Sequence, residues 1–146
     1  MSFDSFDKSS SSNLTYVFFA LIVSFVATLG SLFFSEVMHF IPCSLCWYQR
    51  IFMYSLVLIF LMNLLFPDDK VFKYAILLVL FGWIISIYHN LLMFGIIPEN
   101  LAPCVQGVPC STAYINWLGF ITIPLLSFFA YTTILILLVK MKKELN

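Results

Sequence analysis

Four long apolar stretches alternate with short polar connections along the chain. They run from about Leu14 to Phe34, Leu45 to Phe66, Phe72 to Phe94 and Ile115 to Val139. Each is close to the ~20 residues that a helix needs to cross the ~30 Å hydrocarbon core of a bilayer. Because lipid offers no partner to an open backbone, such segments must be helical. The pattern predicts an all-α fold, a four-helix transmembrane bundle.

The connections indicate how the helices follow one another. The middle one, "PDDKV", is so short that the second and third helices must form a tight antiparallel hairpin. The outer two, "SEVMHFIPCS" and "GIIPENLAPCVQGVPCSTAY", carry all four cysteines. Pro124 falls inside the fourth apolar stretch, where proline predicts a kink. We therefore expect an up-down bundle with two short cysteine-bearing loops on one face.

Composition supports a membrane protein and excludes some partners. Of 146 residues, 62% are hydrophobic and 10% charged, unlike a soluble domain. The zero formal net charge gives no reason to expect nucleic acid as a partner. The polar start lacks the basic region and small-residue cleavage site of a signal peptide. We expect a flexible cytoplasmic tail at 1–13, one four-span membrane domain at 14–139 and a cytoplasmic tail at 140–146.

The positive charges predict the orientation. Six lysines fall on the side that holds both termini and the middle connection, whereas Arg50 alone is associated with the other side; they are Lys8, Lys70, Lys73, Lys140, Lys142 and Lys143. Lysine and arginine are enriched on the cytoplasmic side of membranes. Both termini should then be cytoplasmic in a bacterial inner (cytoplasmic) membrane. The cysteine-bearing loops would face an oxidising exterior, where disulfides persist.

The cysteines form two close pairs, Cys43 and Cys46 in C-x2-C, and Cys104 and Cys110 in C-x5-C. They could be structural disulfides, although such small loops stabilise least. They could form a four-cysteine zinc site, although the second spacing is unusual for one. The third interpretation is redox chemistry, in which a thiolate attacks a disulfide and passes it on. We favour the third interpretation and expect no metal, and keep a structural or metal-binding membrane protein without turnover as the alternative.

Local chemistry around the first pair favours a reactive thiol. Pro42 predicts a helix start at about Cys43 to Leu45, which puts Cys46 in the first turn. The helix dipole stabilises a thiolate there. Arg50 follows four residues later on the same face, where its cation favours the Cys46 thiolate and can hold an oxygen of a ligand. The alternative for Arg50 is a side chain that snorkels to lipid phosphate.

The stretch "PCSLCWYQR" resembles the P-C-x-L-C-x-x-Q-R signature of the DsbB-type membrane thiol oxidases. The resemblance covers nearly the whole chain, with the short "CVQGVPC" loop similar to the short-loop members described as BdbC. It implies a DsbA-like thioredoxin-fold partner, which the protein reoxidises, and a quinone cofactor, ubiquinone or menaquinone. A vitamin-K-epoxide-reductase-like enzyme is disfavoured, because its C-x-x-C belongs near the end of the last span.

The resemblance also implies roles for the four cysteines. The reduced partner attacks Cys104, whose loop mate is Cys110. Cys43 exchanges with that second pair, and Cys46 faces the quinone as a thiolate that can form a charge-transfer adduct.

Three further residues are implied as cofactor-binding. Arg50 would lie beside the quinone oxygen, and Gln49 would donate a hydrogen bond near the ring. His89 corresponds to a histidine that the family often places near the outer end of the third span, and would line the pocket. The alternative for His89 is a hydrogen-bonded packing residue, while His39 is expected to be a solvated or interfacial side chain.

Overall fold

The computed structural model describes residues 3–68, 70–101 and 122–145. Its elements are α1 (Phe3–Glu36), α2 (Ser44–Leu65), α3 (Val71–Met93), the 3-10 turn η1 (Glu99–Leu101) and α4 (Ile123–Leu145). All four α-helices are long and apolar enough to cross a membrane. The prediction of an all-α, four-helix transmembrane bundle is confirmed.

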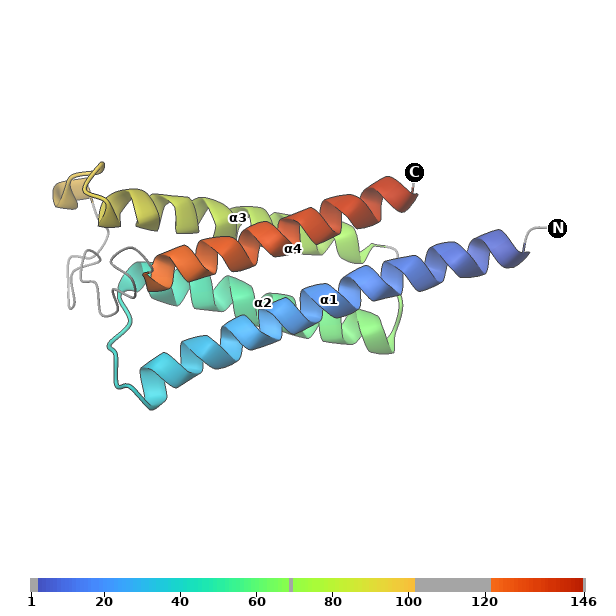
Figure 1. The fold of residues 1–146 in the computed structure, drawn as a ribbon, viewed down its shortest axis with the longest axis horizontal. Coiled ribbons are helices and arrows are strands. Elements are labelled where there is room, and N and C mark those ends of the chain that lie inside the picture. Colours follow the sequence, from blue (N-terminus) through green and yellow to red (C-terminus); the bar gives the residue numbers. More distant parts are fainter. Residues whose placement is uncertain (1–2, 69, 102–121, 146) are drawn as a thin grey trace.

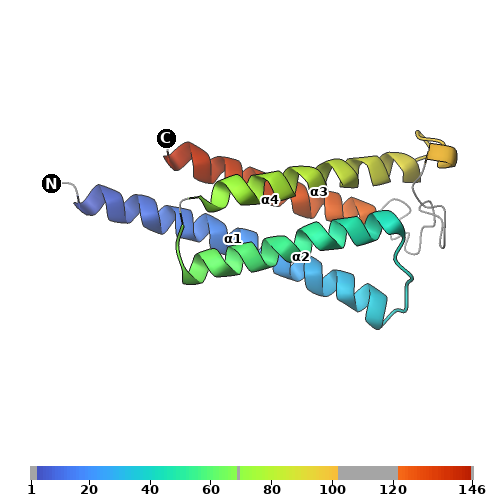
Figure 2. The ribbon, with the colours of Figure 1, turned by 180° about the vertical axis from the view of Figure 1, so that it is seen from behind.

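The helices are arranged around the bundle in the order of the chain. Helix α1 packs against α2 and α4, and α3 packs against the same two helices. The N and C termini lie at the same end as the connection from α2 to α3 (Figure 1). The connection from α1 to α2 and the turn η1 lie at the opposite end (Figure 2). Consecutive helices are therefore antiparallel.

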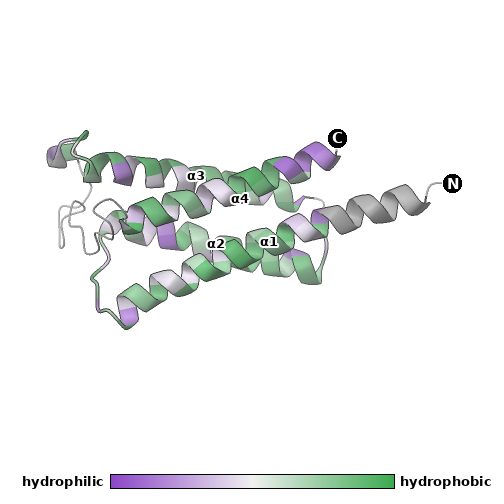
Figure 3. Cartoon of the chain, in the orientation of Figure 1, coloured by the Kyte–Doolittle hydropathy of each residue, from purple (hydrophilic) through white to green (hydrophobic). Residues whose placement is uncertain are grey.

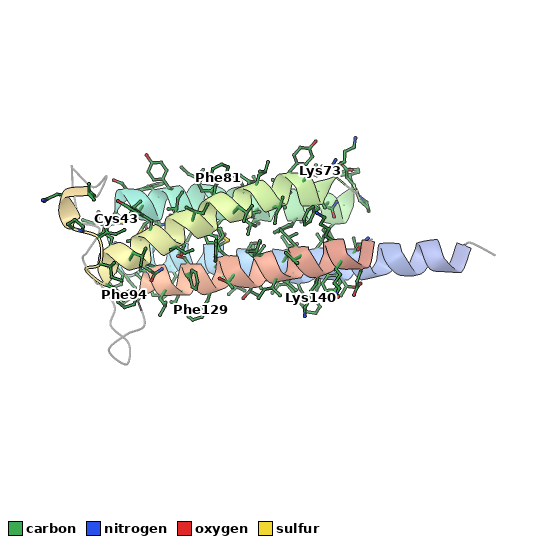
Figure 4. The ribbon with its side chains drawn as sticks, turned by 90° about the horizontal axis from the view of Figure 1, so that it is seen from above. Cys43, Lys73, Phe81, Phe94, Phe129 and Lys140 are labelled. Carbon is green, nitrogen blue, oxygen red and sulfur yellow. The ribbon has the colours of Figure 1, made fainter. Side chains whose placement is uncertain are left out.

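Apolar side chains cover both the inside and the outside of the bundle. The core contains Leu56, Phe60, Val79 and Ile134, each fully buried. Large apolar side chains also face outward; Phe81 is 56% exposed and projects away from the bundle (Figure 4). Hydrophobic residues extend along most of each helix (Figure 3). Helices that are apolar all round are typical of membrane spans.

Two helix starts differ from the sequence prediction. Helix α1 begins at Phe3, ahead of its spanning part at Asn13–Glu36, so helical backbone extends into the segment predicted to be a flexible tail. Helix α4 begins at Ile123, after non-helical Thr122, and not at Ile115. Residues 115–121 lie outside the described residues. The kink predicted at Pro124 is therefore wrong, because proline in a first turn replaces an N–H that has no helical partner.

One close approach between α3 and α4 fixes the inner part of the bundle. Gly82 of α3 lies against the ring of Tyr131, and a Cβ at Gly82 would overlap that ring. Fully buried Tyr131 donates a hydrogen bond of 2.7 Å to the backbone carbonyl of Gln49 in α2. The absence of a side chain at Gly82 thus lets α4 reach α2, next to the cysteine pair.

Candidate redox site

The first cysteine pair lies at the start of α2. Cys43 occupies the N-cap position with extended backbone (φ −72°, ψ 170°), and its carbonyl accepts a 3.1 Å hydrogen bond from the Trp47 N–H. Helix α2 begins at Ser44, so Cys46 lies in its first turn, as predicted. Cys43 lies at the end of the bundle opposite Lys73 and Lys140 (Figure 4).

The two sulfurs are close enough to exchange a proton and to oxidise with little movement. Their Sγ atoms are 3.2 Å apart, both as free thiols, with Cys43 buried and Cys46 half-buried. A disulfide would need them at ~2.0 Å. The hydrogen bond with Cys46 lowers the pKa of the Cys43 thiol; burial opposes this change, and the contact with His89 adds to it. This arrangement favours the negative charge on Cys43, and the thiolate expected on Cys46 stays a prediction.

His89 of α3 brings an imidazole to this pair. It is 1% exposed, and its Nε2 lies 3.8 Å from Cys43 Sγ. Its Nδ1 lies 3.4 Å from Gln49 Nε2. With the amide in this orientation Gln49 donates to Nδ1, so the ring proton is on Nε2 and faces the sulfur. His89 therefore contacts both the redox pair and the polar interior.

Gln49 continues the polar contacts into α4. Its Oε1 lies 2.9 Å from Ser127 Oγ, which is also 2.8 Å from the Pro124 carbonyl oxygen. Asn90 Nδ2 donates to the same carbonyl at 3.0 Å. A chain of polar groups thus runs from Cys43 through His89 and Gln49 to the first turn of α4.

Arg50 is held against α1. Its Nη1 donates to Ser35 Oγ at 3.2 Å and its Nη2 donates to the Ser31 carbonyl at 3.0 Å. The guanidinium also lies 5.8 Å from the centre of the Trp47 ring. A cation is favoured near the C-terminal end of a helix, which is where α1 receives it. Arg50 therefore ties the outer ends of α1 and α2 together.

A cavity of about 500 Å³ connects these residues. Its walls come from all four helices and include every described residue that the sequence singled out for the site: Cys43, Cys46, Gln49, Arg50 and His89. The remaining wall is mostly apolar, with Val26, Phe34 and Ile123 among its residues. This size and lining are typical of a site for a small apolar ligand.

Two residues of the cavity wall carry buried hydroxyl groups. Tyr54 and Thr122 both line the cavity, and among the described residues neither Tyr54 OH nor Thr122 Oγ1 has a hydrogen-bond partner. Buried polar groups are normally paired. An apolar cavity with a cation and a thiol pair in its wall fits a quinone, whose ring is apolar and whose two carbonyl oxygens accept hydrogen bonds.

The sequence prediction missed the residues that support the site. Ser31 and Ser35 hold Arg50, while Ser127 and Tyr131 hold Gln49. Polar residues within apolar spans were the available signal, since they are costly in lipid and usually face the interior. The predicted second pair, Cys104 and Cys110, lies outside the described residues.

Four membrane-spanning helices with a thiol pair at one end are the features expected of a membrane disulfide oxidoreductase. Residues 13–141 match the family described as "Disulfide bond formation protein DsbB", and the chain belongs to that family. The prediction made from "PCSLCWYQR" is thereby confirmed.

Individual relatives cover most of the chain. It is 46% identical over 131 residues to "Disulfide bond formation protein C" of Bacillus subtilis (strain 168), covering 90% of this chain and 95% of that protein. It is 44% identical over 115 residues to "Probable disulfide formation protein C" of Halalkalibacterium halodurans, covering 79% of this chain and 84% of that protein. It is 41% identical over 140 residues to "SPbeta prophage-derived disulfide bond formation protein B" of Bacillus subtilis (strain 168), covering 90% and 93%. No solved structure matches the chain.

Proposed function

We propose that the protein is a quinone-dependent thiol oxidase that reoxidises a DsbA-like thioredoxin-fold protein and so supports disulfide formation in exported proteins. The observation that carries the proposal is the position of the Cys43–Cys46 pair, at a helix start and in the wall of an apolar cavity that also contains Arg50. The pair can meet a dithiol from the aqueous side and an apolar oxidant from the membrane side.

In this proposal the cysteines act in sequence. The reduced partner attacks Cys104 of a Cys104–Cys110 disulfide, and the released thiols then reduce the Cys43–Cys46 disulfide. Each exchange breaks one S–S bond and forms another, so electrons are conserved. When the dithiol of Cys43 and Cys46 is oxidised again, it releases two electrons and two protons. A bound quinone, ubiquinone or menaquinone, supplies the sink for both.

The residues around the pair would bind and orient. Arg50 offers N–H donors in the cavity wall for ligand oxygens. His89 faces Cys43 with its Nε2–H, which can donate a hydrogen bond to the Cys43 thiolate formed during exchange. Cys43 is buried with Leu45 and Leu92, and Cys46 is half-buried beside it.

The proposed location is a bacterial inner membrane with both termini in the cytoplasm. Lys73 and Lys140 lie at the end of the bundle that carries the termini, and Cys43 lies at the other end (Figure 4). The distribution of positive charge therefore supports an outward-facing redox site.

Quinone reduction by membranes that contain the protein tests the proposal. With a reduced thioredoxin-fold dithiol, the wild type should consume quinone and Cys46→Ser should not. Arg50→Ala should weaken the apparent quinone affinity at least about tenfold, because hydrogen bonds to charged groups contribute ~1.5–3 kcal/mol.

Lys73→Ala, which removes a cation at the far end of the bundle, is the matched control and should behave as the wild type. Turnover that survives Cys46→Ser would overturn the oxidase. An unchanged quinone affinity in Arg50→Ala would remove Arg50 from the binding site.

A further inference from the structure

Three metal-ligand atoms meet at the start of α2. The sulfurs of Cys43 and Cys46 and a ring nitrogen of His89 all lie within 4.8 Å of one another. The sulfurs are 3.2 Å apart, and Cys43 Sγ is 3.8 Å from His89 Nε2. Tetrahedral zinc with Zn–S of ~2.3 Å and Zn–N of ~2.0 Å sets neighbouring ligands about 3.5–3.8 Å apart. The two sulfurs would move apart by about half an ångström, Cys43 Sγ and His89 Nε2 would approach by about 0.3 Å, and the Cys46–His89 separation, within 4.8 Å, would shorten by at most about 1.3 Å.

We infer that the reduced pair Cys43 and Cys46, together with His89, binds a thiophilic divalent cation of the Zn²⁺ class in competition with disulfide formation. This set differs from the four-cysteine site considered from the sequence, because a histidine of α3 replaces the second cysteine pair. Regulation of the oxidase by such a cation rests on the proposed function, whereas metal binding itself requires only a reduced pair.

Charge favours a divalent ion at this position. Cys43 and His89 are 8% and 1% exposed, so charge left unbalanced there is costly. The charges of two thiolates, a neutral imidazole and a divalent cation sum to zero. All three ligand residues line the cavity, which leaves room for a fourth ligand from outside the protein. Three protein ligands with an open position characterise reactive zinc sites, and structural sites are closed by four.

Gln49 provides the support that a metal-bound histidine needs. Such a histidine donates its other ring N–H to an oxygen, which fixes the tautomer. Rotating the Gln49 amide by half a turn exchanges two atoms of nearly equal size, so Oε1 would accept from His89 Nδ1 and Nε2 would donate to Ser127 Oγ. Ser127 would keep its donation to the Pro124 carbonyl. The same polar chain thus satisfies either tautomer of His89.

The metal-bound pair and the Cys43–Cys46 disulfide exclude one another. Binding converts two thiols and one cation into two metal–thiolate bonds and two released protons, with no change in oxidation state. Oxidation to the Cys43–Cys46 disulfide leaves no thiolate for the ion. A bound cation would therefore hold the pair reduced and slow its oxidation.

The test uses the full chain in detergent micelles with Cys104→Ser and Cys110→Ser, so that only one pair remains. Co²⁺ is the probe, because its visible absorption bands report tetrahedral coordination by sulfur and nitrogen, and Zn²⁺ should displace it. We expect one ion per reduced chain and none after oxidation to the disulfide. Gln49→Leu should weaken binding about 10–100-fold, as expected for a lost outer-shell partner.

His89→Gln should weaken Co²⁺ binding more than Gln49→Leu does. His39→Asn is the matched control, since it removes the other histidine at a left-handed position (φ 54°) that asparagine tolerates; it should bind as before. Absent binding, equal binding by His89→Gln, or binding that survives oxidation would each overturn the inference. Metal binding without quinone turnover would instead count against the proposed oxidase alone.

Discussion

At the scale of single residues, Gln49 of α2 connects the site to both α3 and α4. Its side chain lies between His89 and Ser127, and its backbone carbonyl accepts from Tyr131. The resemblance implies that Gln49 is a donor near the quinone ring, which stays a prediction, and within the protein one N–H of this amide is bonded to His89. We therefore expect Gln49 to position His89 against Cys43.

Replacing Gln49 with leucine tests this positioning role. Gln49→Leu leaves the His89 ring and the Ser127 hydroxyl without their partner amide. An unsatisfied buried group of this kind costs ~1–3 kcal/mol of stability. Reoxidation of the dithiol should slow at least about fivefold, measured by stopped-flow with quinone in excess. Asn63→Leu is the control, because Asn63 is buried to a similar degree, 8% against 7% exposed, and bonds to the Asp68 carbonyl at the far end of α2. Equal slowing in both variants would show a general loss of stability.

The sequence predicted the parts of the site that depend on local spacing. Pro42 and the helical period placed Cys46 in the first turn and Arg50 on the same face. They did not predict that Ser35 binds Arg50, since contacts between helices depend on how the spans rotate and approach. Apolar spans carry little information about that rotation, because nearly every face is hydrophobic.

At the scale of helices, the contact between Gly82 and Tyr131 sets the distance between α3 and α4. Gly82→Ala should lower the unfolding free energy by ~1–3 kcal/mol, the usual cost of overpacking, because the new methyl group displaces the Tyr131 ring. Thermal unfolding in micelles would measure this loss.

Gly30→Ala serves as the matched control for that substitution. A Cβ at Gly30 of α1 meets nothing within 4 Å, and alanine favours a helix interior. It should leave the protein at least as stable. A Gly82→Ala variant as stable as Gly30→Ala would contradict the close packing of α3 on α4.

The start of α4 shows where a sequence pattern misleads. Hydrophobicity from Ile115 onward predicted one long kinked helix, yet α4 begins at Ile123 with Pro124 in its first turn. The Pro124 carbonyl then accepts hydrogen bonds from Asn90 and Ser127. Hydropathy alone does not distinguish a proline that kinks a helix from one that begins it.

At the scale of the whole molecule, chemistry and positive charge are separated along the bundle. The cysteine pair lies at one end, and the termini and C-terminal lysines lie at the other (Figures 1 and 4). Two equally exposed positions mark these ends, Phe66 at 70% and Ile96 at 68%.

These two positions provide a test of the orientation. In a variant with all four native cysteines replaced by serine, Ile96→Cys should react with a membrane-impermeant maleimide in intact cells. Phe66→Cys should react only after the membrane is permeabilised. The reverse pattern would place the termini outside and contradict the orientation.

This separation along the bundle also determines how the protein will behave in artificial vesicles. A bundle with its reactive thiols at one end will insert into liposomes in two directions, and a dithiol that cannot cross lipid will reach only those chains whose Cys43 end faces the bulk solution. The remaining chains will be latent until detergent opens the vesicle. The ratio of activity before and after detergent will then measure the sidedness of insertion.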